Sequence, residues 1–353
     1  MSAHVTRGLR LGCILAVWVG CLASGCAPKA ALLSPTPTAQ PVVIGYSAPE
    51  LSGGQGVIMA AVKQSVEAQH WQMLTTNANS DSAVQASQID FLLRQKVKAI
   101  VAVPVDSQKI CESVQKAREA GVFFYTVDRA PDSCQIDMAV LSNNYLAGQQ
   151  AGEALVNLLR ARYGRPQGTV LELQGNLLQD VAQLRGSGFH AAVDPYPEIR
   201  VISQPTDWQP ERFASATRAA AQQKLDGIYM QSDCIGTPVV LPILEQLGLK
   251  QPRRSADHIF IVGVDGCSET LQAIRDGFAD QASSQPITDF GLITRWMERE
   301  FAGQPVQAEQ VVETGALWSP GVVEQSPVGW RLLLATTSVT ADNVDDGRLW
   351  GNR

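Results

Sequence analysis

The stretch VKAIVAVPVDSQKICESVQKAREAGVFFYTVDR, residues 97–129, decides the fold. An uninterrupted apolar run over residues 99–103 turns at Pro104 and leads into an amphipathic segment that ends at Gly121. A second apolar run follows over residues 122–127. A buried strand, a helix and a second buried strand are typical of a parallel sheet covered on both faces.

The second strand of this unit ends on Asp128 and Arg129. Ligands of open parallel α/β sheets bind outside the carboxyl ends of the strands. Asp128 and Arg129 are therefore candidate ligand-binding groups, although they can also pair with each other or cap the next turn. Ser107 or Asp106 is suited to cap the helix of the unit.

Strands and helices alternate through the rest of the chain, which predicts a doubly wound α/β architecture. Expected strands lie at residues 42–46, 71–75, 169–173, 200–204, 226–230 and 258–264. Expected helices lie at residues 57–66, 83–95, 144–162, 181–193, 211–223 and 237–247.

Two segments of the sequence share one pattern, which we call the internal repeat. GVFFYTVDRAPDSC at 121–134 and HIFIVGVDGCSET at 258–270 both run an apolar strand into Val-Asp and then to a cysteine. Two similar lobes that each present an aspartate, Asp128 and Asp265, would form a cleft suited to a small polar molecule. Trp208 follows a strand in SQPTDW and is a candidate to stack on a sugar ring, or alternatively a core residue.

The N-terminus resembles an export signal. Arg7 and Arg10 precede an apolar run at 11–19, and LASGC at 22–26 resembles a bacterial lipobox with lipidation at Cys26. We expect residues 1–25 to be a signal peptide, with a plain signal peptide as the alternative to a lipoprotein signal. Residues 26–41, rich in Pro, Ala, Thr and Ser, would then form a flexible tether. The predicted location is extracytoplasmic, in the periplasm or on the outer face of the cell membrane, with membrane contact only through the lipid anchor.

The chain has a formal net charge of −6 and no basic run, which argues against a nucleic-acid partner. Of its seven cysteines, two lie in the expected signal and Cys26 is the expected anchor. An even number remains for an oxidising compartment, and we favour the pairs Cys111–Cys134 and Cys234–Cys267. A metal site is the rival interpretation, weakened by the absence of CxxC and by scattered histidines.

Catalytic signals are weak. The sequence lacks HExxH, GxSxG and any Ser-His-Asp spacing, so we expect neither an enzyme nor a cofactor. Paired acids suggest a glycosidase, but acids on separately moving lobes suit chemistry poorly. LSGGQ at 51–55 matches a transporter ATPase signature, but a Gly-Lys phosphate loop is missing. Its glycines would instead let the backbone approach a ligand.

Over residues 42–315 the chain resembles the periplasmic sugar-binding proteins of the ribose-binding class, the solute receptors of ABC importers. Ordered landmarks carry this resemblance: TVDRA at 126–130, SNNYLAGQQ at 142–150, LELQG at 171–175, RGSGF at 185–189, SQPTDW at 203–208, QSD at 231–233 and VGVDG at 262–266. The C-terminal TADNVDDGRLWGN, residues 340–352, resembles a tail of some sugar-binding lipoproteins, with no ligand role that we can assign.

The resemblance implies a type 1 fold, with two Rossmann-like lobes of parallel sheet joined by a three-strand hinge. Crossovers would lie near residues 142–144, 285–286 and 313–315. The N-terminal lobe would comprise residues 42–142 and 286–313, and the C-terminal lobe residues 143–285 and 314–353.

The resemblance also implies a set of ligand contacts: Asp128, Arg129, Trp208, Asp265, Gln183, Ser232, Gln285, Gln55 and Ser52. The family usually has an Asn and two Phe at the first helix, where this chain has Ser52, Gly54 and Gln55. Gln183 replaces an arginine that grips a pentose, while Arg185 remains as a structural arginine. The expected ligand is therefore a sugar, polyol or nucleoside that is larger or more polar than ribose, or is not ribose, and a hexose, a polyol and a nucleoside all remain open.

The function that the resemblance implies is capture of this ligand by hinged closure and delivery to ABC permease subunits, by a monomer. A receptor for a chemoreceptor or sensor kinase, built on the same fold, is the alternative. A sugar-responsive repressor would need a helix-turn-helix at its N-terminus, which the sequence lacks.

Overall fold

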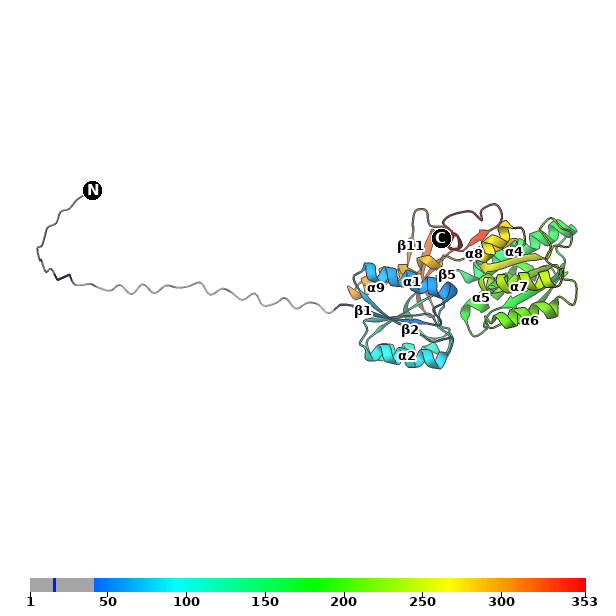
Figure 1. Ribbon diagram of the computed structural model, residues 1–353. Helices are drawn as coiled ribbons and strands as arrows, with labels where there is room; N and C mark the ends of the chain where they lie inside the picture. Colours follow the sequence, from blue (N-terminus) through cyan, green and yellow to red (C-terminus); the bar gives the residue numbers. More distant parts are fainter. Residues whose placement is uncertain (1–14, 17–40) are drawn as a thin grey trace, which may run out of the picture. The chain divides into compact units, whose positions relative to one another are not determined.

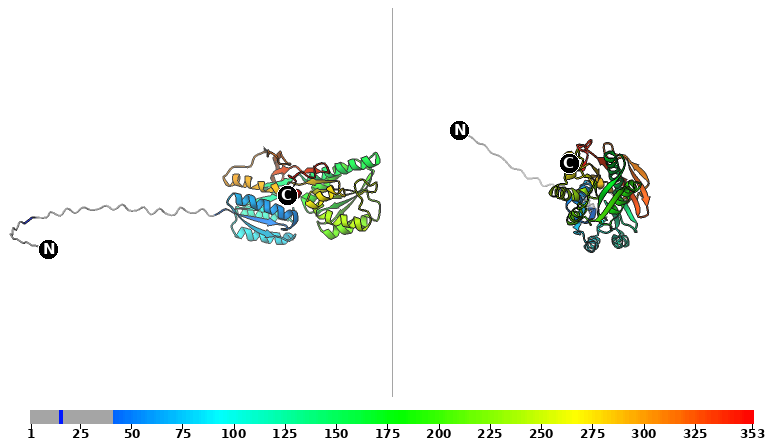
Figure 2. Two further views of the ribbon diagram at one scale, coloured as in Figure 1. Left: turned by 45° about the horizontal axis from the view of Figure 1, so that its top comes forward. Right: turned by 90° about the vertical axis from the view of Figure 1, so that its right-hand side faces the viewer.

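The computed structural model describes residues 15–16 and 41–353, of which residues 41–353 form one compact unit. The expected signal peptide, the lipobox and Cys26 lie outside the described residues. Within the described part of the chain, no helix has the length and apolar character needed to cross a membrane. The compact unit consists of two lobes, each a sheet with helices on both faces (Figures 1 and 2).

The N-terminal lobe contains an eight-stranded sheet in the order β11-β12-β13-β5-β4-β3-β1-β2. Its strands are β1 (Val43–Ala48), β2 (Gln72–Asn77), β3 (Ala99–Ala102), β4 (Phe123–Val127), β5 (Ile136–Ser142), β11 (Glu309–Val311), β12 (Gly321–Ser326) and β13 (Gly329–Leu334). Its helices are α1 (Gly53–Ala68), α2 (Ser82–Arg94), α3 (Ile110–Glu119), η1 (Ile287–Leu292) and α9 (Ile293–Phe301). In this sheet β12 runs antiparallel to both of its neighbours, β11 and β13, and the other pairs are parallel.

The C-terminal lobe contains a six-stranded sheet in the order β14-β10-β9-β8-β6-β7, in which β14 alone pairs antiparallel. Its strands are β6 (Gly168–Gln174), β7 (Ile199–Pro205), β8 (Gly227–Met230), β9 (Phe260–Asp265), β10 (Gln281–Ser284) and β14 (Thr337–Val339). Its helices are α4 (Asn144–Tyr163), α5 (Asp180–Val193), α6 (Pro210–Ala220), α7 (Asp233–Gln246), α8 (Ser268–Arg275) and η2 (Trp350–Asn352).

Residues 97–129 form β3, α3 and β4, as predicted. All four side chains of β3 are buried, with Ala99 and Val101 in one core cluster and Ile100 and Ala102 in another. Side chains alternate across a strand, so a strand between two helical layers needs apolar residues at every position. Asp106 accepts hydrogen bonds from the backbone N–H groups of Gln108 and Lys109, both at 2.9 Å, just before α3 begins.

The chain passes between the lobes three times, and the third crossing corrects one predicted boundary. The first two crossings follow β5 and β10, at the expected places near residues 142–144 and 285–286. The third lies between β13 and β14, at residues 335–336, and not at 313–315. Residues 321–334 therefore belong to the N-terminal lobe, because β13 pairs in parallel with β5.

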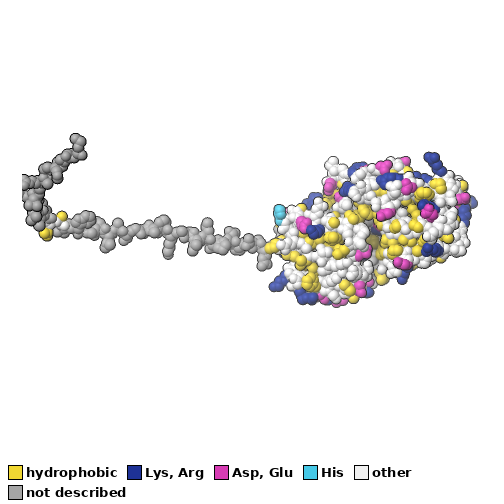
Figure 3. Space-filling model, in the orientation of Figure 1, with side chains coloured by type: hydrophobic (Ala, Val, Ile, Leu, Met, Phe, Trp, Pro, Cys, Tyr) yellow, Lys and Arg dark blue, Asp and Glu magenta, His cyan; other side chains and the backbone are white. Residues whose placement is uncertain are grey.

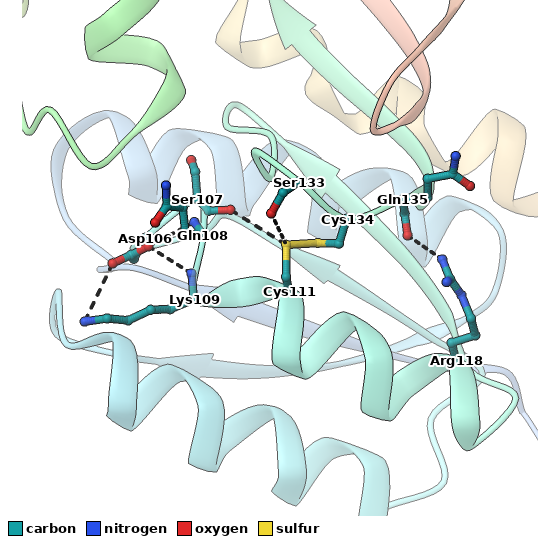
Figure 4. The surroundings of a disulfide bond; sticks show 9 residues. All are labelled: Asp106, Ser107, Gln108, Lys109, Cys111, Arg118, Ser133, Cys134 and Gln135. Atoms are coloured by element: carbon teal, nitrogen blue, oxygen red, sulfur yellow. Dashed lines mark hydrogen bonds and ion pairs between the residues drawn. A yellow bond between two sulfur atoms is a disulfide. The ribbon is translucent and has the colours of Figure 1, made fainter.

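A disulfide joins Cys111 of α3 to Cys134 in the loop after β4, as predicted (Figure 4). The hydroxyl of Ser133 lies 3.7 Å from the sulfur of Cys111. Close by, the guanidinium of Arg118 donates to the backbone oxygen of Gln135 at 2.7 Å. The disulfide therefore fixes the segment that follows Asp128 and Arg129 to the helix beside it.

Candidate ligand-binding site

A cavity of about 420 Å³ lies between the two lobes. This volume falls in the range of small-molecule sites. The space-filling view shows the groove between the lobes (Figure 3). Eight of the nine predicted ligand contacts line the cavity: Ser52, Gln55, Asp128, Arg129, Trp208, Ser232, Asp265 and Gln285. Gly53 and Gly54 of the LSGGQG segment line it too, so backbone does approach the cavity there.

Asp128 and Asp265 occupy equivalent places in the two lobes. Asp128 directly follows β4 and Asp265 is the last residue of β9. Both have positive φ angles, +67° for Asp128 and +121° for Asp265, in a region that non-glycine residues rarely adopt. Such conformations persist where the surrounding structure holds them, and they are concentrated at functional sites. The internal repeat of the sequence therefore corresponds to two carboxylates, Asp128 and Asp265, that line one cavity.

Asp128 is surrounded by side chains of the N-terminal lobe. Gln55 in α1 donates a hydrogen bond from Nε2 to Asp128 Oδ2 at 2.8 Å. Arg129 donates from Nη1 to the backbone oxygen of Pro104 at 3.1 Å, and its Nε lies 3.7 Å from Asp128 Oδ2. Burial lowers the pKa of Arg129 from its ordinary value, and the charge of Asp128 opposes this shift.

Two buried polar atoms at this half-site lack a hydrogen-bond partner among the described residues: Gln55 Oε1 and Arg129 Nε. A buried polar group without a partner costs about 1–3 kcal/mol. Both residues line the cavity. The half-site therefore has unused hydrogen-bonding capacity next to the space where a ligand would sit.

Asp265 receives three donors, all from the C-terminal lobe or the second crossover. Ser232 donates from its hydroxyl at 2.5 Å, and Gln285 donates from Nε2 at 3.2 Å. Arg185 Nη1 lies 3.1 Å from Asp265 Oδ1. Burial raises the pKa of Asp265, while the charge of Arg185 opposes the increase.

Arg185 reaches the cavity because α4 and α5 pack backbone to backbone. A Cβ atom added at Gly148 would overlap the backbone oxygen of Arg185, and one added at Gly188 would overlap that of Tyr145. Arg185 Nε then donates to Asn144 Oδ1 at 2.9 Å, and its Nη1 donates to the backbone oxygen of Gln231. Gly148 of the landmark SNNYLAGQQ and Gly188 of RGSGF thus determine how closely the two helices approach, and so how far the Arg185 side chain reaches into the cavity.

Trp208 forms a fixed wall of the cavity. Its indole N–H donates to Gln179 Oε1 at 2.6 Å, and its φ angle is +61°. The ring lies so close to Gly175 that a Cβ atom there would overlap it. On another side, the Arg185 guanidinium carbon lies 5.8 Å from the ring centroid, within the range of a cation–π interaction.

Comparison with known proteins identifies the family. Residues 45–297 match the model of the periplasmic binding protein domain, which covers well over half of the chain. The chain belongs to the periplasmic binding protein family. It is therefore a solute-binding protein rather than an enzyme.

Relatives of this periplasmic binding protein share about a quarter of its sequence. It is 27% identical to the xylitol-binding protein of Mycolicibacterium smegmatis over 286 residues, covering 79% of this chain and 71% of that protein. It is 26% identical to the ribose import binding protein of Bacillus subtilis over 238 residues, covering 67% of this chain and 73% of that protein. The crystal structure of a galactofuranose binding protein superposes with a TM-score of 0.73 at 20% identity, covering 87% of this chain and 97% of that one.

Gln183 of this binding protein does not line the cavity, which corrects the ninth predicted contact. Its side chain is exposed and donates to the backbone oxygen of Leu177 at 2.9 Å. On α5, positions four residues apart share a face, so Val181 and Arg185 point into the cavity together. Gln183 lies between them in sequence and projects from a different face of the helix.

Among the polar or aromatic cavity-lining residues that the sequence-based prediction omitted are Asn176, Gln179, Arg185, Asp207 and Trp350. Three of them follow strand ends, where the rule that predicted Asp128 would also have found them. Arg185 is a buried charge in a glycine-rich helix, which is itself a signal of close packing. Trp350 comes from the C-terminal tail and left no signal of this kind in the sequence.

Cys234 and Cys267 are free thiols in the structure, which corrects the predicted second disulfide. Their sulfur atoms and a carboxylate oxygen of Asp233 lie within 4.8 Å of one another. The Asp233 carboxylate is already engaged by the Gly266 N–H and the Thr270 hydroxyl. Burial raises the pKa of Asp233 to about 8, with the nearby charge of Asp265 as a second cause. Because the Asp233 carboxylate oxygens already accept these hydrogen bonds, we assign no metal to this cluster.

Proposed function

We propose that this chain captures a sugar or polyol between its lobes and delivers it to the permease of an ABC importer. The observation that carries the proposal is the convergence of Asp128 and Arg129 from one lobe with Asp265, Arg185 and Trp208 from the other on a single cavity.

The chemistry of the lining favours a neutral, hydroxyl-rich molecule. Carboxylates accept hydrogen bonds from hydroxyl groups, while guanidinium groups donate to hydroxyl and ring oxygens. Arg129 and Arg185 balance the charges of Asp128 and Asp265, and Glu50 and Asp207 add further negative charge to the lining, which disfavours an anionic ligand. An indole face packs on the apolar C–H face of a sugar. The relatives named for binding xylitol and importing ribose support the same ligand class.

Contacts between the lobes support a closure mechanism. Ser107 in the N-terminal lobe donates from its backbone N–H to the Leu178 oxygen at 3.2 Å. Gln179 donates from Nε2 to the Val105 oxygen at 3.0 Å. A ligand that bridges the half-sites stabilises the closed arrangement, because it makes contacts there that an open arrangement lacks. The closed surface would then be the form that the permease recognises.

Calorimetric titration with xylitol, D-ribose and myo-inositol tests the ligand class. We expect at least one of these probes to bind, and Asp128→Asn and Asp265→Asn each to weaken it about tenfold or more, as expected for loss of a charged hydrogen-bond acceptor. Asp257→Asn is the matched control, because Asp257 is exposed and does not line the cavity. Wild-type affinity in both cavity variants would overturn the site, and binding of none of the three probes would count against the ligand class.

We also propose that Cys26 carries the lipid that retains the protein outside the cytoplasm. The lipobox-like LASGC and the proline-rich segment after it support this proposal. Mass spectrometry of the mature N-terminus from native membranes should find an acylated Cys26, and Cys26→Ser should release the protein into the soluble fraction. An unmodified N-terminus at another residue would contradict it.

A further inference from the structure

The C-terminal tail, residues 340–353, is fastened to the C-terminal lobe and ends at the junction of the lobes (Figure 1). Before it, β14 pairs with the edge strand β10. Val344 and Leu349 are buried in the core of that lobe. Arg275 in α8 bonds the tail twice, from Nε to Asp345 Oδ1 and from Nη2 to Asn352 Oδ1, both at 2.7 Å. These contacts fix the residues between them.

The fixed tail places Trp350 in the wall of the ligand cavity, beside Asp265, Gln285 and Ile287. The side chain also packs against the core cluster of the N-terminal lobe, to which Ile287 belongs. A Cβ atom at the next residue, Gly351, would collide with the backbone oxygen of Gly266. Only glycine therefore lets the tail approach the end of β9 this closely.

The indole N–H of Trp350 is occupied by the backbone oxygen of Asp265, at 2.8 Å. The same oxygen accepts the backbone N–H of Gln285 at 3.1 Å. These two hydrogen bonds hold the backbone of Asp265, whose φ angle of +121° is unusual for a residue other than glycine. With its only polar atom satisfied in this way, the part of the Trp350 side chain that lines the cavity offers an apolar surface.

We propose that Trp350 is a specificity-determining residue, whose ring forms the second aromatic wall of the ligand pocket and whose N–H positions Asp265. This inference rests on the proposed function. Trp208 and Trp350 come from different elements, the loop after β7 and η2, and both line the cavity. A flat ligand that presents a C–H face would gain contact area with each indole.

Two substitutions of Trp350 and one control distinguish the contribution of the indole ring to ligand affinity from that of its hydrogen bond to Asp265. Trp350→Phe keeps a flat ring and loses the N–H, Trp350→Leu keeps apolar bulk without a ring, and Trp330→Phe in β13 is the control outside the cavity. With whichever of D-ribose, myo-inositol and xylitol binds the wild type, we expect about threefold weaker binding for the Phe variant and about tenfold or more for the Leu variant. We expect the loss in the Leu variant to be larger for the cyclic probes than for open-chain xylitol.

Equal losses in the Phe and Leu variants, or unchanged affinity in both, would overturn the role of the ring. Thermal unfolding of each variant shows whether the fold is retained. A wild-type protein that binds none of the probes would instead count against the proposed function. In that case the indole absorption and fluorescence of wild type and Trp350→Phe, with and without a molecule co-purified from the native host, provide the readout for Trp350. An identical spectral response in both proteins would overturn the inference.

Discussion

The carboxylate of Asp180, the first residue of α5, accepts a hydrogen bond from the backbone N–H of Ala130 in the opposite lobe, at 3.1 Å. The Asp180 backbone N–H in turn donates a hydrogen bond to the Ser107 hydroxyl oxygen, at 3.3 Å. Asp180 Oδ1 is buried and has no hydrogen-bond partner among the described residues. Burial raises the pKa of Asp180 to about 7, and the charge of Asp128 adds to the increase.

The hydrogen bonds of Asp180 to Ala130 and Ser107, which together we call the Asp180 latch, join the two lobes. They predict that closure of the lobes depends on pH. An open arrangement exposes Asp180 and returns its pKa towards the ordinary value of 3.8, so closure takes up a proton between that pH and about 7. The favourable contribution of Asp180 to the free energy of closure is complete below about pH 3.8. It is lost as the pH rises through about 7. Affinity for a bound probe should therefore fall up to about tenfold between about pH 6 and about pH 8.

Asp180→Asn tests this prediction, since an amide oxygen can still accept from Ala130 without carrying a charge. Titrations at several pH values should show a flatter dependence in the variant and tighter binding than wild type at pH 8. Asp194→Asn serves as a control, because Asp194 follows the same helix at its far end. A wild-type affinity that does not change over this pH range would rule out the latch as a titrating element.

The backbone contact between α4 and α5 predicts a large effect of a single methyl group. Gly148→Ala would force the helices apart, because its Cβ would overlap the Arg185 oxygen. We expect a loss of about 3 kcal/mol in the free energy of unfolding, at the upper end of overpacking effects. Urea unfolding measures it, with Gly347→Ala as the control, because nothing lies within 4 Å of a Cβ atom there. A change below about 0.5 kcal/mol at Gly148 would contradict the predicted packing.

The disulfide predicts a stability change that is separate from ligand binding. Cys111 and Cys134 are 23 residues apart, and a loop of this length corresponds to a stabilisation of about 3 kcal/mol. The double substitution Cys111→Ser and Cys134→Ser should lower the free energy of unfolding by about this amount, measured in urea. A reducing agent should destabilise the wild type similarly and leave the double variant unchanged. Equal sensitivity of both proteins to the reducing agent would show that the bond is absent.

His190 links pH to the stability of the C-terminal lobe. Its ring lies 3.1 Å from Glu172 Oε2 and 2.9 Å from Asp194 Oδ1. The hydrogen bond to buried Glu172 is the main cause that raises the pKa of His190 to about 9. Stability from this ion pair should be complete below about pH 6.5 and be lost as the pH rises through 9.

Because His190 is partly exposed, we expect a loss of only about 1 kcal/mol across this range. Unfolding curves at pH 6.5 and pH 9.5 measure it, and His190→Asn should show a smaller difference between the two. A larger difference in the variant would contradict the assignment.

The order of strands and helices could be predicted from the sequence. A continuous apolar run such as residues 99–103 indicates a strand that is buried on both faces, whatever its neighbours in the sheet are. The same local logic placed Asp128 and Asp265 at strand ends, and hence on one edge of each sheet. The third crossing could not be predicted in this way, since the pairing of β13 with β5 joins segments almost two hundred residues apart. Gln183 was assigned by its position in a motif, and the rotation of α5 against α4 decided that Arg185 takes the place in the cavity.

The alternation of strands and helices and the two carboxylates at strand ends follow from the sequence by itself, because periodicity and strand-end position are local properties of the chain. The resemblance of its ordered landmarks indicates the family and its two joined lobes. Only the tertiary structure decided that Cys234 and Cys267 are free thiols, that Asp180 bonds Ala130 of the opposite lobe, and that Trp350 lines the pocket. Each of these depends on the distance between elements remote in sequence, and that distance is fixed by packing and not by the order of residues.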